Sequence, residues 1–197
     1  MMRTNTGKMR ILTFCLTLAF LAGMSHLALP AAGAQDQFGL LTVTGMVKVN
    51  GKPAATGDIV ASGSEIQTGK GSSADVNLAE LGRVEALSST TMKLRYDGTS
   101  TTHTQASVAI LLADGSVRVS PGEGIVFNVD AGTTVTRPSS RTQQNVFTVD
   151  TTCGNILVSA EKGKVELRAG DSVKQIAAGG QDMIGQAKPN CTPSRNP

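Results

Sequence analysis

The chain is poor in the side chains that build cofactor and metal sites. Its 197 residues include no tryptophan, one tyrosine, two histidines and three cysteines. A site rich in metal ligands or aromatic contacts needs more of these residues than the sequence supplies. At the same time 40% of the residues are hydrophobic, too many for a disordered chain. We therefore expect a folded protein with no cofactor and no metal ion.

The chain also lacks a surplus of charge outside its first residues. Arg3, Lys8 and Arg10 account for the whole formal net charge of +3, and the residues from Gln35 onward carry equal numbers of basic and acidic side chains. Binding to the phosphates of a nucleic acid needs a basic surface. The sequence therefore predicts no nucleic-acid partner.

No catalytic motif is present. The sequence contains neither G-x-S-x-G nor H-E-x-x-H, and the run GSEIQTGKG (63–71) departs from a phosphate loop at its first glycine and at Gly71. The acidic residues are mostly isolated, and several stand beside glycine, which is typical of turns. We predict no catalytic residue and no enzymatic activity; a hydrolase with carboxylates scattered among loops is a distant alternative.

The first 34 residues have the three parts of a secretory signal. Residues 1–10 are polar and positive, residues 11–29 are mostly apolar, and Ala32 and Ala34 occupy the small-residue positions. We predict cleavage after Ala34; an uncleaved anchor is the alternative, because 19 residues can just cross a bilayer. Both interpretations export the chain from Gln35 onward, to the periplasm or the medium, and a stable membrane span exists only in the second.

Export makes a disulfide the expected state of the remaining cysteines. Cys15 lies in the signal, which leaves Cys153 and Cys191 as a pair in an oxidising compartment. The bond would tie a Pro-rich tail (187–197) to the domain that precedes it (35–186). A nucleophilic Cys153 is the alternative, but no histidine or asparagine signature lies near it.

Alternation of apolar and polar residues predicts an all-β domain. Short segments with a period of two recur between clusters of Gly, Asn, Asp and Ser, as in a β-sandwich, roll or solenoid. The polar stretches 97–105 and 136–144 are predicted loops. The segments predicted as strands with one buried face are 41–44, 46–49, 74–78, 92–96, 117–119, 125–129 and 165–167.

Glycines mark a repeated turn and strand unit. Six of them, from Gly39 to Gly69, fall six residues apart, but the residues before them do not fit a hexapeptide β-helix, so we interpret them as turns between very short strands. The pattern Gly-x-Val-x-apolar recurs at Gly45, Gly82, Gly115 and Gly163, as expected for stacked turn and strand units.

Few side chains are candidates for contact with a partner. Phe127 and Phe147 lie within predicted strands and are expected in the core. Tyr96 ends a strand beside a polar loop, which makes it the predicted contact residue, together with His103 in that loop.

The run from Gly45 to Tyr96 resembles the start of FecR-type domains. Shorter stretches at 115–119, 125–135, 147–159 and 163–171 are also similar, so the resemblance covers most of residues 35–186. The turn and strand residues that carry the match include Gly45, Gly57, Gly63, Thr68, Gly69, Ser73, Ala74 and Gly82.

The resemblance implies an exported all-β domain of short twisted strands. Well-known members relay the occupancy of an outer-membrane iron transporter to a cytoplasmic sigma factor. With only ten residues before the apolar run, this chain is expected to lack the cytoplasmic part of that relay. What carries over is a non-enzymatic module that senses or binds a protein or another component of the bacterial cell envelope. The alternative is a structural envelope protein that assembles through its β edges.

Overall fold

The protein folds into two facing β-sheets. The computed structural model describes residues 38–97, 105–186, 188, 189 and 191; the predicted signal (1–34) and His103 lie outside them. A single short 3-10 turn, η1 (Ala79–Leu81), is the one helical element within this part of the chain. In spatial order, sheet A contains β17 (Gln181–Ile184), β14 (Ile156–Lys162), β13 (Val146–Asp150), β10 (Ser116–Pro121), β7 (Gly82–Ala86), β6 (Ser73–Asn77), β1 (Gly39–Thr44) and β4 (Ile59–Val60). Sheet B contains β16 (Ser172–Ala177), β15 (Lys164–Ala169), β12 (Thr134–Pro138), β11 (Val126–Ala131), β9 (Ser107–Asp114), β8 (Thr91–Asp97), β5 (Glu65–Thr68), β2 (Val47–Val49) and β3 (Lys52–Pro53).

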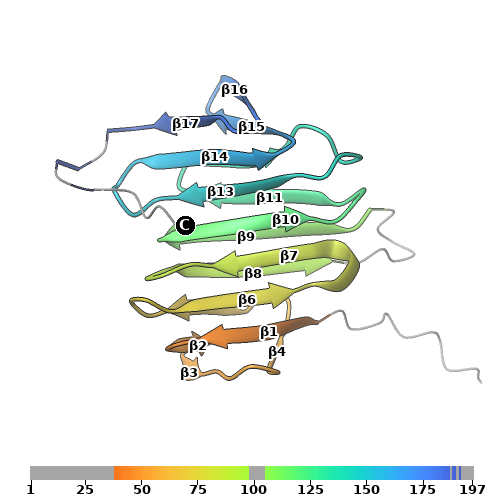
Figure 1. Ribbon diagram of the computed structural model, residues 1–197, viewed down its shortest axis with the longest axis vertical. Helices are drawn as coiled ribbons and strands as arrows, with labels where there is room; N and C mark the ends of the chain where they lie inside the picture. Colours follow the sequence, from red (N-terminus) through yellow and green to blue (C-terminus); the bar gives the residue numbers. More distant parts are fainter. Residues whose placement is uncertain (1–37, 98–104, 187, 190, 192–197) are drawn as a thin grey trace, which may run out of the picture. The chain divides into compact units, whose positions relative to one another are not determined.

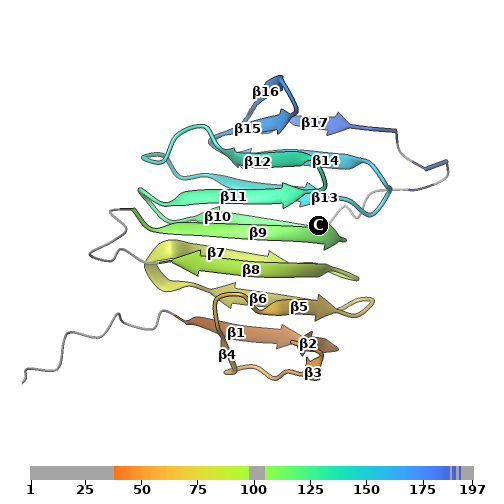
Figure 2. The ribbon, with the colours of Figure 1, turned by 180° about the vertical axis from the view of Figure 1, so that it is seen from behind.

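Successive strands are added to both sheets in the same direction along the body. After two strands in one sheet it usually crosses to the other, so that β6 and β7 are followed by β8 and β9 in the opposite layer (Figure 1). The same ladder of strands is seen from the side of sheet B in Figure 2. Neighbouring strands are antiparallel, with the exception of the parallel pair β9 and β11. The all-β prediction, with a solenoid-like progression of short strands, is therefore confirmed.

One hydrophobic core fills the space between the sheets. Most strands turn alternate apolar residues inward, as in β8, where Met92 and Leu94 are fully buried while Lys93 and Arg95 are exposed. Because each sheet has only one apolar face, neither sheet can be stable without the other. Phe127 and Phe147 are the largest fully buried side chains, in agreement with the prediction.

The repeated Gly-x-Val pattern corresponds to a repeated turn. Each of its four glycines has a positive φ, between 75° and 119°, and stands before or at the first residue of a strand. The valine two positions later is buried in every case, with 4% exposure at Val47 and none at Val84, Val117 and Val165. At Gly115 a side chain would collide with Thr90, so both space and backbone angle require glycine there.

The polar stretch 136–144 is only in part a loop. The prediction is wrong for residues 136–138, which form the second half of β12 and pair with β15. Ser139 N donates to Lys164 O at 2.8 Å, so the backbone of Ser139 faces β15. Because successive residues of a strand face opposite neighbours, the backbone of Pro138 faces away from β15, and the pairing does not need the N–H that proline lacks.

Tyr96 is a core residue rather than a contact residue. The prediction fails because Tyr96 continues the inward face of Met92 and Leu94, and its side chain is only 3% exposed. Its hydroxyl finds partners inside the protein, donating to Val60 O and accepting from Gly39 N at 3.0 Å. One phenol thus joins β8 of sheet B to β1 and β4 of sheet A.

Cys153 and Cys191 form the predicted disulfide. Their Cα atoms are 5.5 Å apart and 38 positions separate them in the chain. Cys153 lies in the turn after β13 and is buried, and Lys188 N donates to Cys153 O at 2.9 Å. The tail residues that the structure describes are therefore held against this turn by a covalent bond and a backbone hydrogen bond.

Replacing both cysteines, as C153S/C191S, should lower the stability of the domain. Opening a loop of this length costs roughly 4 kcal/mol in the chain-entropy model. For a domain of this size that corresponds to a fall in Tm on the order of 10 °C. Calorimetry of the oxidised protein, the reduced protein and the double variant measures the effect, and an unchanged Tm would contradict the stabilising role of the bond.

The burial of Tyr96 should appear in its titration. Burial raises the pKa of its phenol, and the hydrogen bond from Gly39 offsets only part of the shift. Since Tyr96 is the one tyrosine of a chain without tryptophan, near-ultraviolet absorbance follows its ionisation alone. The folded protein should ionise above the ordinary value of about 10, and the unfolded chain close to it. The stability that depends on the neutral phenol is then complete below pH 10 and is lost as pH rises through the folded pKa.

A second variant measures the contribution of the Tyr96 hydroxyl to stability separately from that of the ring. Y96F keeps the packing but leaves Gly39 N–H and Val60 C=O without their partner, which should cost about 1–3 kcal/mol in denaturant unfolding. A wild-type midpoint at or below 10 in the folded state would show that the phenol is exposed.

Candidate functional site

The motif residues singled out in the sequence are structural. Gly45, Gly57 and Gly63 lie in turns, Ser73 and Ala74 lie in β6, and the described part of the chain brings them to no common surface site.

Of the remaining motif residues, Thr68 and Gly69 lie at crossings between the sheets, and Gly82 lies at the connection between two strands of sheet A. Thr68 is buried at the end of β5; its hydroxyl donates to Leu87 O and accepts from Thr90 N at 2.9 Å. Gly69 N donates to Met46 O at 2.8 Å. Gly82 begins β7 with a positive φ, against the backbone of Ser120.

An apolar patch lies at the N-terminal end of sheet A. Its members are Phe38, Leu40 and Ile59, which are 57%, 51% and 61% exposed. Leu40 of β1 and Ile59 of β4 are direct partners in the ladder, so their side chains share a face, and Phe38 is two residues before Leu40. A contiguous exposed apolar patch of this kind is a candidate surface for binding another protein. We call these three residues the N-terminal patch.

The edge of sheet A beside the N-terminal patch is open. β4 pairs with β1 only. Leu41 N donates to Asp58 O at 2.9 Å, so the backbone of Asp58 faces β1. Because successive residues of a strand face opposite sides, the backbone N–H and C=O of the next residue, Ile59, face outward. An unpaired edge of this kind can accept a further strand.

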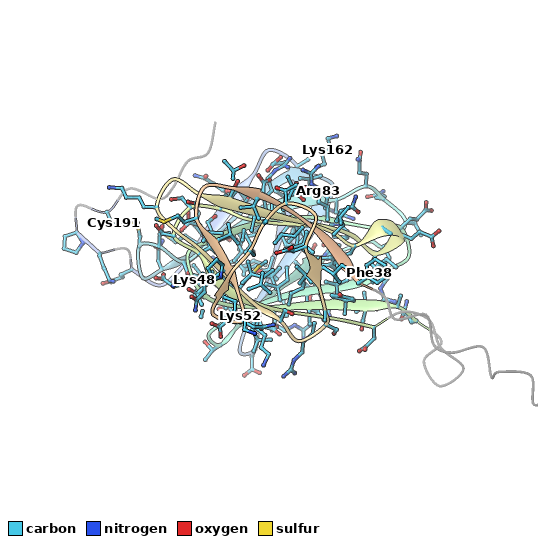
Figure 3. All side chains as sticks on the ribbon, turned by 90° about the horizontal axis from the view of Figure 1, so that it is seen from below. Phe38, Lys48, Lys52, Arg83, Lys162 and Cys191 are labelled. Atoms are coloured by element: carbon cyan, nitrogen blue, oxygen red, sulfur yellow. A yellow bond between two sulfur atoms is a disulfide. The ribbon has the colours of Figure 1, made fainter. Side chains whose placement is uncertain are left out.

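The neighbouring edge of sheet B is protected. It is formed by β3, which consists of Lys52 and Pro53 and, like β4, is two residues long. Ala54 N donates to Val47 O at 3.0 Å, so the residue before it, Pro53, faces outward with no N–H to offer. Figure 3 looks at this end of the body and shows Lys48 and Lys52 on one side and Phe38 apart from them.

The two edges at the other end are protected by a charge pair. In their ladders Lys174 of β16 is opposite Leu167, and Asp182 of β17 is opposite Val158. Both partners are fully buried, so the two charged side chains are on the core-facing sides of their sheets. Lys174 Nζ lies 3.0 Å from Asp182 Oδ1, so a partly exposed ion pair links the ends of the two sheets.

A polar cleft interrupts the outer surface of sheet B. It has a volume of about 240 Å³ and is lined by residues of β11, β12 and β15 and of the segments beside them: Ile125, Val126, Phe127, Asn128, Arg137, Pro138, Ser139, Arg141 and Glu166. The pairing of β11 with β12 covers only 129–131 and 134–136, and beyond it the strands separate. We call this opening the β11–β12 cleft.

The arginines around the β11–β12 cleft differ in whether they pair with an acidic side chain. Arg137 donates to Glu166 Oε1 at 2.7 and 3.1 Å, and Arg168 donates to the same oxygen at 3.1 Å. Partial burial raises the pKa of Glu166, but the hydrogen bonds from Arg168 and Arg137 outweigh it and hold that pKa below its ordinary value. Arg141 has no acidic partner within 4.0 Å among the described residues.

Two further features bear on function. Within residues 38–97 and 105–186, His, Cys, Asp and Glu side chains do not gather in groups of three or more that would suit a metal ion. In the same part of the chain, none of the helical structure has the length and apolarity needed to cross a membrane.

Comparison with known proteins gives structural matches of low sequence identity and no family. No protein-family model matches the chain, and a search of curated proteins finds no significant relative. Two crystal structures of a protein from Parabacteroides distasonis, described as a "putative anti-sigma factor", are similar, with TM-scores of 0.49 and sequence identities of 20% and 21%. Each alignment covers 66% of this chain and 57% of that one.

Proposed function

We propose that the chain is an exported, non-enzymatic module of the bacterial cell envelope that binds another protein at the N-terminal end of sheet A. The observation that carries this proposal is the contrast between the edges of the two sheets. Lys52 and Pro53 protect one edge, and the Lys174–Asp182 pair protects two. The fourth edge combines an outward-facing Ile59 backbone with the N-terminal patch.

A protein strand is the occupant that suits this end. Its backbone can pair with Ile59 while an apolar side chain covers Phe38 and Leu40, the mode known as β-augmentation. An anionic membrane surface fits less well, because the exposed Lys48 and Lys52 lie away from Phe38 (Figure 3).

Self-association is a weaker candidate for the same surface. The N-terminal patch presents on the order of 300 Å², so a copy of the chain, like any protein partner, must also bury surface beside the patch to reach the roughly 800 Å² per partner of a stable interface. A filament built through β edges would also need an accepting edge at the opposite end, where the charged side chains of Lys174 and Asp182 face inward. The guarded edges therefore favour a discrete partner over the structural envelope protein.

The sensing role rests on the FecR-type resemblance. A module that signals by changing partners needs a rigid body with a localised contact surface, and the arrangement of one core and one open edge supplies it. In this proposal residues 35–186 are the interaction domain in the periplasm or the medium.

The N-terminal patch should be needed for capture of the partner. The tagged domain from Gln35 onward, incubated with envelope extracts, should retain a discrete protein, and I59K should reduce its recovery at least tenfold, because a charge replaces an apolar contact at the open edge. Since Ile59 is exposed, the free energy of unfolding of I59K should differ from that of the wild type by no more than about 0.5 kcal/mol.

V173K is the matched control. Val173 is exposed to a similar degree at the opposite end of the body, so this variant should capture the partner normally. Equal recovery with I59K and V173K, or concentration-dependent self-association of the wild type in size-exclusion chromatography, would refute the proposal.

A further inference from the structure

We propose that the β11–β12 cleft binds a short extended peptide segment that carries a carboxylate. The cleft lies on the outer face of sheet B and shares no residue with the N-terminal patch. This second site is therefore independent of the proposed function and can be tested without it.

The cleft exists because one hydrogen bond of the ladder cannot form. Continuing the register of β11 and β12 would place Phe127 opposite Pro138. Ser139 N donates to Lys164 O, so alternation turns Pro138 toward β11, where an N–H is required and proline has none. The two strands therefore separate at this position.

The separation leaves a piece of strand edge inside the sheet. Val126 N donates to Ala106 O at 3.1 Å, so the backbone of Val126 faces β9 and the backbone of its neighbour Phe127 faces the cleft. Phe127 N–H and C=O have no ladder partner on that side among the described residues. A peptide in extended conformation offers the complementary C=O and N–H.

Arg141 supplies the charge that selects the ligand. Its backbone accepts a hydrogen bond from Gly124 N at 2.8 Å, which fixes the loop at the end of the cleft. Arg141 lines the cleft and has no acidic partner within 4.0 Å among the described residues, whereas the guanidinium of Arg137 is engaged by Glu166. A guanidinium beside a backbone N–H is suited to a carboxylate, from either a chain terminus or an acidic side chain.

The size of the cleft limits the ligand. Its volume of about 240 Å³ is below the roughly 300–1,000 Å³ of sites for drug-sized molecules. A short piece of chain fits this space better than a nucleotide or another large cofactor.

The test is a nuclear magnetic resonance titration of the oxidised domain with three acetylated four-residue peptides. The first consists of valine and threonine and has a free carboxyl terminus, and the second is the C-terminal amide of the same sequence. The third is also an amide but has an aspartate at an internal position. We expect shifts of the Phe127 and Asn128 amides with one or both acidic peptides and at least tenfold weaker binding of the neutral amide. The tighter acidic peptide identifies the source of the carboxylate.

Three variants separate the contributions of charge and backbone. R141Q should weaken binding of the acidic peptide about tenfold, the effect expected for one charge-assisted hydrogen bond. R95Q removes an exposed arginine from β8 on the same sheet and should bind normally. P138V restores an N–H opposite Phe127, so it should protect the Phe127 amide from hydrogen exchange and abolish binding while the domain stays folded.

The outcomes are decisive in both directions. Loss of binding in R141Q and P138V but not in R95Q supports the site. No shift at Phe127 with any peptide, equal binding of the neutral amide, or unchanged binding in R141Q overturns it.

Discussion

The left-handed turn before an inward-facing valine is the constraint on which the rest of the fold depends. Each sheet has one apolar face, so the chain must cross repeatedly between two layers and start each new strand with its valine directed into the core. At Gly115 the backbone packs against Thr90, whose hydroxyl donates to Ser116 O and accepts from Ser116 N. A residue with a side chain would move the strand away, and Val117 with it.

The same geometry separates stability from recognition. The core runs without a break along the two sheets, so the middle strands satisfy each other and have little to offer a partner. Within the described strands, unpaired backbone groups remain where a sheet ends or where its ladder is interrupted. Recognition is therefore concentrated at β4 and at the β11–β12 cleft, because extra chain can pair there without disturbing the core.

The alternation of apolar and polar residues predicted the strands that have one solvent-exposed face. It failed where the environment of a residue depends on partners that are distant in the sequence. β9 was missed because Leu111 is half-exposed between the buried Ile110 and Leu112, which hides the period of two. Tyr96 looked like a contact residue because its partners, Gly39 and Val60, are far away in the sequence. The N-terminal patch could not be read from the sequence either, since Leu40 and Ile59 become neighbours only through pairing.

Two prolines show why position in the ladder matters more than residue type. Pro53 faces outward on the last strand of sheet B, where a missing N–H protects the edge from further pairing. Pro138 lacks the same group but faces β11 inside the sheet, where the missing bond opens a cleft. Sequence analysis placed Pro138 in a loop, although β12 continues through it. One deletion of a hydrogen-bond donor thus closes a surface at one position and creates a candidate binding site at the other.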